Sequence, residues 1–196
     1  MMSKTRRAQP SNQLRIIGGA WRGRKLSFPS VEGLRPTPGR VRETVFNWLT
    51  GHLDGAQCID LFAGSGALGF EALSRGARYC CFIDRSDLVN QAIKASAQTL
   101  GCGEHVSVLQ RDSSQPVSLD RVFDVVFLDP PFANNLTAPC LKWLLASNLL
   151  RSDTLLYLET PKAVTVHDER LRTLKEKTMG DVTCRVMVPR EFGLFF

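Results

Sequence analysis

The sequence predicts an α/β fold with a mostly parallel sheet that ends in an antiparallel hairpin. Between residues 57 and 159, short apolar segments alternate with longer segments whose apolar residues have helical spacing. This alternation is typical of a parallel sheet with helices on both faces. Later in the chain, two strand-like segments are separated only by Met179-Gly180-Asp181, which indicates a hairpin.

The first 50 residues differ in character from the rest of the chain. Residues 1–13 are polar and lack periodicity, so we expect a mobile basic tail. Two short extended segments within residues 14–28, around Gly18-Gly19 and Gly23, predict a small β-hairpin. After two prolines, the apolar residues between 41 and 49 have helical spacing, and Thr37 is the expected cap of this helix.

The main domain, residues 51–196, should contain five strands and three helices before the final hairpin. The strands are expected at residues 58–62, 79–83, 106–109, 122–128 and 155–159. The helices are expected from the turn after the first strand to residue 73, and over residues 88–100 and 138–150. The strands of the hairpin are expected at residues 171–178 and 182–188.

Composition narrows the class of protein. With 196 residues, of which 43% are hydrophobic, the chain can build one well-buried core. The sequence has no apolar run of the roughly 18 residues that span a bilayer, and its N-terminus does not resemble a secretory signal. Six cysteines without CxxC spacing favour a reduced cytoplasmic protein that has neither a disulfide framework nor a metal site.

Positive charge is concentrated near the N-terminus. Residues 1–42 contain ten Lys or Arg residues and a single acid, Glu32. This concentration suggests a polyanionic partner, because neutralising phosphates releases counterions. A solvated basic tail is the alternative.

A glycine-rich turn should follow the first strand of the main domain. The run from Asp60 to Gly69 reads DLFAGSGALG, and its three glycines have the spacing of a dinucleotide-binding fingerprint. In open α/β sheets this turn binds the ligand, and glycine allows the backbone to approach it closely. An NAD-dependent enzyme therefore has to be considered beside other nucleotide-binding enzymes.

Acidic residues follow three successive strands. Asp60, Asp84 and Asp112 stand at or just after the expected carboxyl ends. A carboxylate at the second strand can accept the hydroxyls of a ribose, which NAD and S-adenosylmethionine share. Each acid alone could be a turn or cap residue, but three together are better explained by one shared ligand.

The fourth strand ends in Asp129-Pro130-Pro131-Phe132. Paired prolines cannot continue a strand, so the chain leaves the sheet here in a stiff loop. The Asp129 carboxylate and nearby carbonyls can accept the N–H groups of an exocyclic amine, while Phe132 can stack on the base. An ordinary proline-terminated strand with Phe132 in the core is the alternative.

These motifs together resemble the class I, Rossmann-like methyltransferases, whose fourth strand ends in [DNS]-PP-[FYW]. The resemblance implies a seven-stranded sheet, S-adenosylmethionine as cofactor and methylation of an exocyclic amino nitrogen. It also assigns the residues of the site. The cofactor-binding residues would be Asp60, Phe62, Ala63, Gly64, Ser65, Gly66, Asp84, Arg85, Asp112 and Ser113, and the catalytic residues Asp129, Pro130, Pro131 and Phe132.

A closer resemblance is carried by the N-terminal segments RIIGGAWRGRKL (residues 15–26), LRPT (residues 34–37) and RVRETVFNWL (residues 40–49). They are similar to the RsmD family of bacterial 16S rRNA guanine-966 N2-methyltransferases. The family implies as partner 16S rRNA in the 30S subunit or in an assembly intermediate, and we expect a monomer. Within residues 14–50, the extension that would bind RNA and cover the active site, the expected RNA contacts are Arg15, Arg22, Arg24, Lys25, Arg35, Arg40 and Arg42.

The sequence departs from the family pattern at Gly39, where relatives usually have an acid. Two further functions remain open at this point. A DNA adenine-N6 methyltransferase would use the same four-residue motif, although 196 residues leave no room for a separate target-recognition domain. A non-catalytic RNA-binding assembly factor would not need Gly64, Gly66, Asp84 and Asp129 to be intact.

Overall fold

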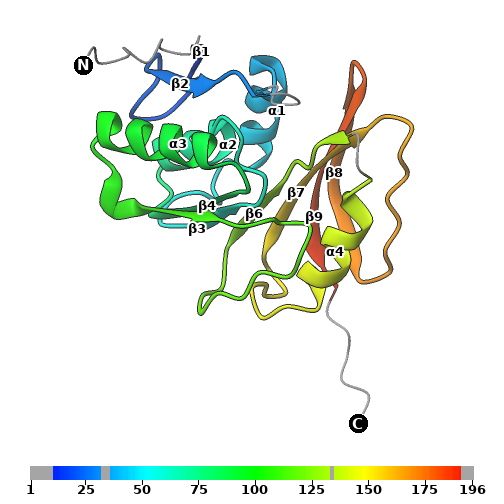
Figure 1. Cartoon of the computed structure of the whole chain (residues 1–196). Helices are drawn as coiled ribbons and strands as arrows, with labels where there is room; N and C mark the ends of the chain where they lie inside the picture. The colour runs from blue at the N-terminus through cyan, green and yellow to red at the C-terminus, as the bar shows by residue number, and fades with distance from the viewer. Residues whose placement is uncertain (1–10, 32–35, 133–134, 191–196) are drawn as a thin grey trace, which may run out of the picture.

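The computed structural model describes residues 11–31, 36–132 and 135–190. A seven-stranded sheet has the order β5-β4-β3-β6-β7-β9-β8, and β1 and β2 form a separate two-stranded sheet (Figure 1). The strands are β1 Ser11–Arg15, β2 Lys25–Pro29, β3 Gln57–Asp60, β4 Tyr79–Asp84, β5 Val106–Gln110, β6 Val125–Leu128, β7 Leu155–Pro161, β8 Leu171–Met179 and β9 Val182–Pro189. The helices are α1 Gly39–Trp48, α2 Ala67–Ser74, α3 Asp87–Leu100 and α4 Thr137–Leu145, and a short 3-10 helix spans Gly103–His105.

The topology is the seven-stranded, mostly parallel sheet with an antiparallel end that the sequence predicted. Strands β3 to β7 pair in parallel with one another, whereas β9 pairs antiparallel with both β7 and β8. The chain moves outward in one direction through β4 and β5, then returns to the other side of β3 to form β6. This reversal between β3 and β6 is the point where open α/β sheets bind ligands, at the carboxyl ends of the strands.

Helices cover both faces of the sheet. One apolar core lies between the sheet and α1, α2 and α3, and it also includes side chains of the β1–β2 hairpin. A second core on the opposite face contains side chains of α4. Alternate residues of each central strand enter the two cores, which explains why these strands are apolar throughout.

Three predicted boundaries were wrong by three residues or more. The fourth predicted strand starts at Val125 instead of Val122, because the backbone N–H of Phe123 bonds to Leu149 O in a loop contact. Helix α4 ends at Leu145, well before residue 150, and the Ser147 hydroxyl bonds to Leu144 O and accepts from the backbone N–H of Leu149 just beyond it. The hairpin begins within the expected tail, since β1 starts at Ser11; residues 1–10 lie outside the described part.

A buried carboxylate joins the N-terminal extension to the main domain. Glu71, in α2, is fully buried and accepts hydrogen bonds from the backbone N–H groups of Ile17 (2.8 Å) and Gly18 (2.7 Å). It also forms ion pairs with Arg42 of α1 (3.4 Å) and Arg75 (2.8 Å). Glu71 thus helps to hold the extension against α2, together with Ser74, which bonds to Gly18 and Trp21. The hairpin lies over the helices of this face (Figure 1).

Within the described ranges, no helix is both long enough and apolar enough to cross a membrane.

Candidate active site

Four carboxylates occupy the carboxyl ends of four adjacent strands. In sheet order they are Asp84 on β4, Asp60 on β3, Asp129 just after β6 and Glu159 on β7. The residue two positions before each carboxylate points into the apolar core between the sheet and α1, α2 and α3. These core residues are, in the same order, Phe82, Cys58, Phe127 and Tyr157. Because side chains alternate between the faces of a strand, the four carboxylates lie on that same face. The topology thus gathers them beside the switch point.

The glycine-rich turn is shaped by close packing. Gly66 has φ +74° and immediately precedes α2, and a Cβ there would lie 2.7 Å from the Phe70 ring. A Cβ on Gly69 would lie 2.3 Å from the Phe82 ring. Gly69 therefore permits α2 to pack closely on β4, while Gly66 provides a left-handed turn that other residues rarely adopt.

Asp60 is a buried acid with a free acceptor. Its Oδ2 accepts a hydrogen bond from the backbone N–H of Gly69 (3.2 Å), whereas Oδ1 has no partner among the described residues. Burial, opposed by the bond from Gly69, raises the pKa of Asp60 to about 7. A buried oxygen without a partner is costly unless a ligand satisfies it.

Asp84 holds the turn and retains acceptor capacity. Its Oδ2 accepts from the backbone N–H of Gly64 (3.0 Å), and its Oδ1 accepts from that of Ser86 (2.8 Å). Each carboxylate oxygen has a second lone pair. The half-buried side chain can therefore still accept two ribose hydroxyls.

The third predicted acid has a different environment. Asp112 is exposed and accepts from the backbone N–H of Ser114 (2.9 Å), and this bond lowers the pKa of its carboxyl group. The neighbouring Ser113 is buried, and its hydroxyl has no partner within the described ranges. Its carbonyl accepts from the indole N–H of Trp143 (3.1 Å), which fixes this turn against α4.

Asp129 is held by the N-terminal extension. The Thr37 hydroxyl donates to Asp129 Oδ2 at 3.2 Å, and Thr37 is itself buried. The prediction that Thr37 caps the following helix was therefore wrong: Pro38 occupies the cap position, and no side chain bonds there. Burial and the nearby Glu159 carboxylate raise the pKa of Asp129 well above its usual range, although the bond from Thr37 opposes the shift.

The three residues after Asp129 differ in solvent exposure. Pro130 is buried, whereas Pro131 and Phe132 are exposed, with 43% of the Phe132 surface accessible. The alternative that Phe132 belongs to the core is therefore wrong. An exposed ring beside a fixed carboxylate is free to stack on a planar group.

Glu159 was missed in the sequence analysis. It is 5% exposed and accepts from the Tyr157 hydroxyl (2.8 Å), while the thiol of Cys184 lies 3.9 Å from the same oxygen, Oε2. Burial raises the pKa of Glu159. An acid at the end of an otherwise apolar strand, LLYLE, was the signal in the sequence.

The predicted RNA contacts divide by exposure. Exposed positions are occupied by Arg15, Arg22, Arg24, Lys25 and Arg40. Arg35 lies outside the described residues. Arg42 is buried, and its guanidinium donates to Thr37 O (3.2 Å), Arg15 O (3.0 Å) and Glu71. The structure thus places Arg42 inside the interface between the extension and α2, and we no longer assign it to RNA.

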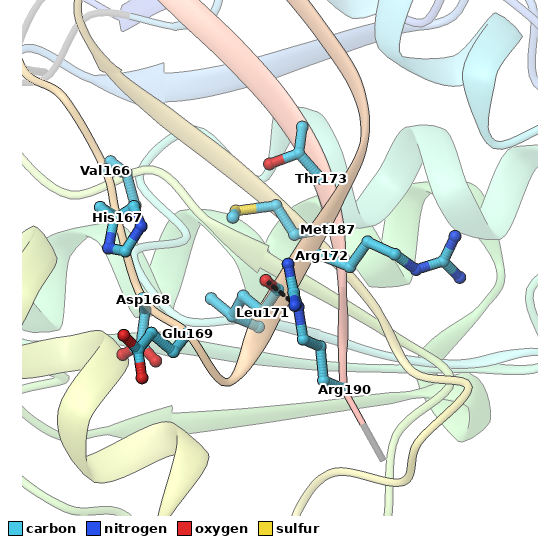
Figure 2. Close-up of a pocket in the computed structure, with 9 residues that line it drawn as sticks. All are labelled: Val166, His167, Asp168, Glu169, Leu171, Arg172, Thr173, Met187 and Arg190. Carbon is cyan, nitrogen blue, oxygen red and sulfur yellow. Dashed lines mark hydrogen bonds between the residues drawn. The ribbon is translucent and has the colours of Figure 1, made fainter. Parts of the chain in front are cut away.

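A separate pocket lies at the opposite end of the sheet. It has a volume of about 720 Å³ and is lined by residues of the loop before β8, by β8 itself, and by Met187 and Arg190 near the end of β9 (Figure 2). Since β9 is antiparallel to β7, the end of β9 adjoins the amino end of β7. The pocket is therefore remote from the carboxylates described above.

In the ranges that the structure describes, no group of three or more His, Cys, Asp or Glu side chains could hold a metal ion. All six cysteines are buried and unpaired.

Comparisons with known proteins agree on one family. A family model described as "Conserved hypothetical protein 95" matches residues 14–188. The chain is 44% identical, over 191 residues, to the ribosomal RNA small subunit methyltransferase D of Haemophilus influenzae, and the match covers 94% of this chain and 98% of that protein. The Escherichia coli protein of the same name is 44% identical over 150 residues, 76% of each chain.

Solved structures agree on the fold. A candidate methyltransferase from Escherichia coli superposes with a TM-score of 0.80 at 40% identity, covering 91% of this chain and 98% of that one. A 16S rRNA N2 guanine methyltransferase of Thermus thermophilus, solved with AdoMet and guanosine, superposes with a TM-score of 0.68. At 16% identity, and with 92% of this chain and 50% of that one covered, the second likeness concerns the fold alone.

Proposed function

The chain belongs to the family of ribosomal RNA small subunit methyltransferase D, and we propose that it transfers a methyl group from S-adenosylmethionine to the N2 amino group of a guanine in 16S rRNA. By family resemblance the target is guanine-966. The observation that carries the proposal is the position of Asp129, fixed by Thr37, beside the acids and glycines of the switch point.

The residues around the glycine-rich turn fit S-adenosylmethionine. Asp84 has free lone pairs for two ribose hydroxyls, and the unpartnered Asp60 Oδ1 can face the positively charged part of the cofactor. The unpartnered Ser113 hydroxyl and the exposed Asp112 carboxylate stand where the adenine would be held. The remaining predicted cofactor residues are Phe62, Ala63, Gly64, Ser65, Gly66 and Arg85. When bound, the cofactor supplies an electrophilic methyl group.

Asp129 compensates for the weak nucleophilicity of the target amine. The lone pair of an exocyclic amine is delocalised into the ring, so attack on the methyl group creates positive charge on nitrogen. The Asp129 carboxylate, fixed by Thr37, accepts an N–H of the amine and stabilises that charge. After transfer, the methylated amine would lose one proton to Asp129 or to water.

The exposed loop after Asp129 and the N-terminal extension would hold the RNA. Phe132 offers its accessible ring to the target base, and the rigid Pro130-Pro131 pair keeps the loop in place. Five exposed basic residues of the extension, Arg15, Arg22, Arg24, Lys25 and Arg40, would contact phosphates, which orient the RNA without choosing the base. Residues 14–50 therefore act, in this proposal, as an RNA-binding cover on the domain formed by residues 51–196.

A direct assay distinguishes the proposed function from the two alternatives, a DNA adenine-N6 methyltransferase and a non-catalytic assembly factor. Purified protein is incubated with tritiated S-adenosylmethionine and either 30S particles or duplex DNA, and the modified nucleoside is then located by mass mapping. We expect N2-methylguanine in 16S rRNA. Incorporation into DNA alone would favour an adenine-N6 methyltransferase, and failure to bind the cofactor in calorimetry would favour a non-catalytic assembly factor.

A further inference from the structure

The carboxylate of Glu159 stands next to that of Asp129. Leu128 and Leu158 are paired in register between β6 and β7, so the residues that follow them, Asp129 and Glu159, are also neighbours. Both side chains lie on the face that α1, α2 and α3 cover. The influence of the Glu159 charge on Asp129 is consistent with this proximity.

One oxygen of Glu159 is held by the protein, and the other is not. Oε2 accepts from the Tyr157 hydroxyl at 2.8 Å and lies near the Cys184 thiol. Oε1 has no hydrogen-bond partner among the described residues. The side chain is thus oriented from one end, and its other end is an acceptor beside Asp129. The Glu159 residue is 5% exposed, and Oε1 is not among the fully buried polar atoms that lack a partner, so this oxygen remains accessible to a ligand.

The Watson–Crick edge of guanine matches two adjacent acceptors. Its N1–H and its N2 amino group are neighbouring donors, whereas adenine presents an unprotonated N1 beside its N6 amino group. Single-stranded bases are commonly read through this edge. A second carboxylate would attract the N1–H of guanine and repel the N1 lone pair of adenine, which gives both a favourable contact and a penalty against the wrong base.

We propose that Glu159 is a specificity-determining residue, whose Oε1 accepts the N1–H of the target guanine while Asp129 accepts its N2 amino group. The inference rests on the proposed function and deepens it. Asp129 alone requires only an amine on a base, and Glu159 adds the requirement for a hydrogen on the adjacent ring nitrogen. The base is thereby chosen by two residues of neighbouring strands.

The base analogue 2-aminopurine isolates this contact. It keeps the amino group at C2, but its N1 carries no hydrogen. After mass mapping has located the nucleotide that the wild-type protein methylates, 30S particles are reconstituted from 16S rRNA with guanine or 2-aminopurine at that position. The ratio of kcat/KM for guanine to that for 2-aminopurine is then measured for each variant.

We expect the wild-type ratio to be about ten or more, because a site built to bond a substrate N–H rejects an analogue that lacks it. Glu159→Gln should lower this ratio at least about ten-fold, since the Gln amide can donate to the bare N1 of 2-aminopurine. The control Glu104→Gln removes an exposed carboxylate beside the amino end of β5 and should keep the wild-type ratio. The missing O6 of 2-aminopurine affects the ratio of every variant in the same way, so its effect cancels when the ratios of the variants are compared with that of the wild type.

A second variant tests the same role in case Glu159→Gln does not fold. Tyr157→Phe removes the hydroxyl that orients Glu159 and should lower the ratio by a smaller factor, with S-adenosylmethionine affinity unchanged in calorimetry. Ratios equal to the wild type in both variants would overturn the role of Glu159, while guanine methylation by the wild type would leave the proposed function intact. Absence of any transfer to 16S rRNA by the wild type would instead refute the proposed function.

Discussion

The hydroxyl of Thr37 lies 3.2 Å from Asp129 Oδ2, although 92 residues separate the two in the chain. Thr37 belongs to the N-terminal extension, and Asp129 follows a central strand of the main domain. The backbone carbonyl of Thr37 is held in turn by the buried guanidinium of Arg42 (3.2 Å). The extension therefore contributes directly to the geometry of the proposed active site.

Replacing Thr37 with Val should lower kcat about ten-fold, because a hydrogen bond to a charged acceptor contributes about 1.5 kcal/mol or more. Affinity for S-adenosylmethionine should not change, since among the described site residues the Thr37 hydroxyl hydrogen-bonds to Asp129 alone. Single-turnover transfer and calorimetry measure the two quantities. Thr44→Val, which removes a hydroxyl bonded to Arg40 O within α1, is the matched control. Equal rates in the two variants would contradict the role of Thr37.

Replacing Asp129 with Ala should reduce methyl transfer by at least about 100-fold while cofactor binding stays near normal, because Asp129 is assigned to the target amine. Asp129→Asn keeps an acceptor oxygen but not the charge, and its loss should be smaller. Tritium incorporation into 30S particles gives the rates, and calorimetry gives the cofactor affinity. An Ala variant with near-normal turnover would remove Asp129 from the mechanism.

Glu71→Gln should lower the free energy of unfolding by about 3 kcal/mol or more, because it leaves the buried Arg42 without its compensating charge. The amide would also present N–H groups to donors that now bond to a carboxylate, including the backbone of Ile17 and Gly18. Urea unfolding measures the change. Glu43→Gln, at an exposed position of α1, should have nearly wild-type stability. A Glu71 variant as stable as this control would show that the hydrogen bonds and ion pairs of Glu71 are not important for stability.

Asp60 predicts a pH dependence of stability. Burial raises its pKa in the folded protein from 3.8 to about 7, so the folded state keeps a proton that the unfolded chain has already released. The contribution of Asp60 to stability therefore falls as pH rises from about 4 to 7, by at most about 4 kcal/mol, and is constant at higher pH.

Urea unfolding of the wild type and of Asp60→Asn at pH 5 and pH 8 tests this dependence. The wild type should lose more stability than the variant between the two values, since Asn does not titrate. Glu159 also has a raised pKa, is present in both proteins and cancels in the difference. The pKa of Asp129 is raised in part by the Asp60 charge, so the difference between the two proteins includes the effect of Asp60 on Asp129. Parallel changes in the two proteins would mean that Asp60 is ionised in the folded state throughout this range.

Removing three exposed charges of the hairpin, as Arg22→Gln, Arg24→Gln and Lys25→Gln together, should weaken binding to 30S particles and flatten its salt dependence. The slope of log K against log salt should fall by about 2 to 3 if all three contact phosphates. A triple variant of the β8 residues Arg172, Lys175 and Lys177 loses the same charge on another exposed surface. The same slope in both triple variants would show that the hairpin has no special role.

Much of the fold and part of the site could be predicted from local sequence. Apolar strands alternate with helical segments because each strand is buried on two faces, so the order of elements is visible in the periodicity. The DLFAGSGALG turn and the prolines after Asp129 have local requirements for a left-handed backbone and for the end of a strand. For such features the residue types are themselves the physical cause.

The tertiary structure alone decided the partnerships between distant residues. Thr37 has the residue type and position of a helix cap, yet its hydroxyl bonds to Asp129 once the extension packs over β6. Arg42 is one of several arginines in a basic segment, and only its contact with Glu71 distinguishes it as a buried ion-pair residue. Glu159 gains its proposed role from the neighbouring end of β6. Hydrogen bonds and ion pairs of this kind depend on which strands become neighbours, and local spacing in the sequence does not specify that.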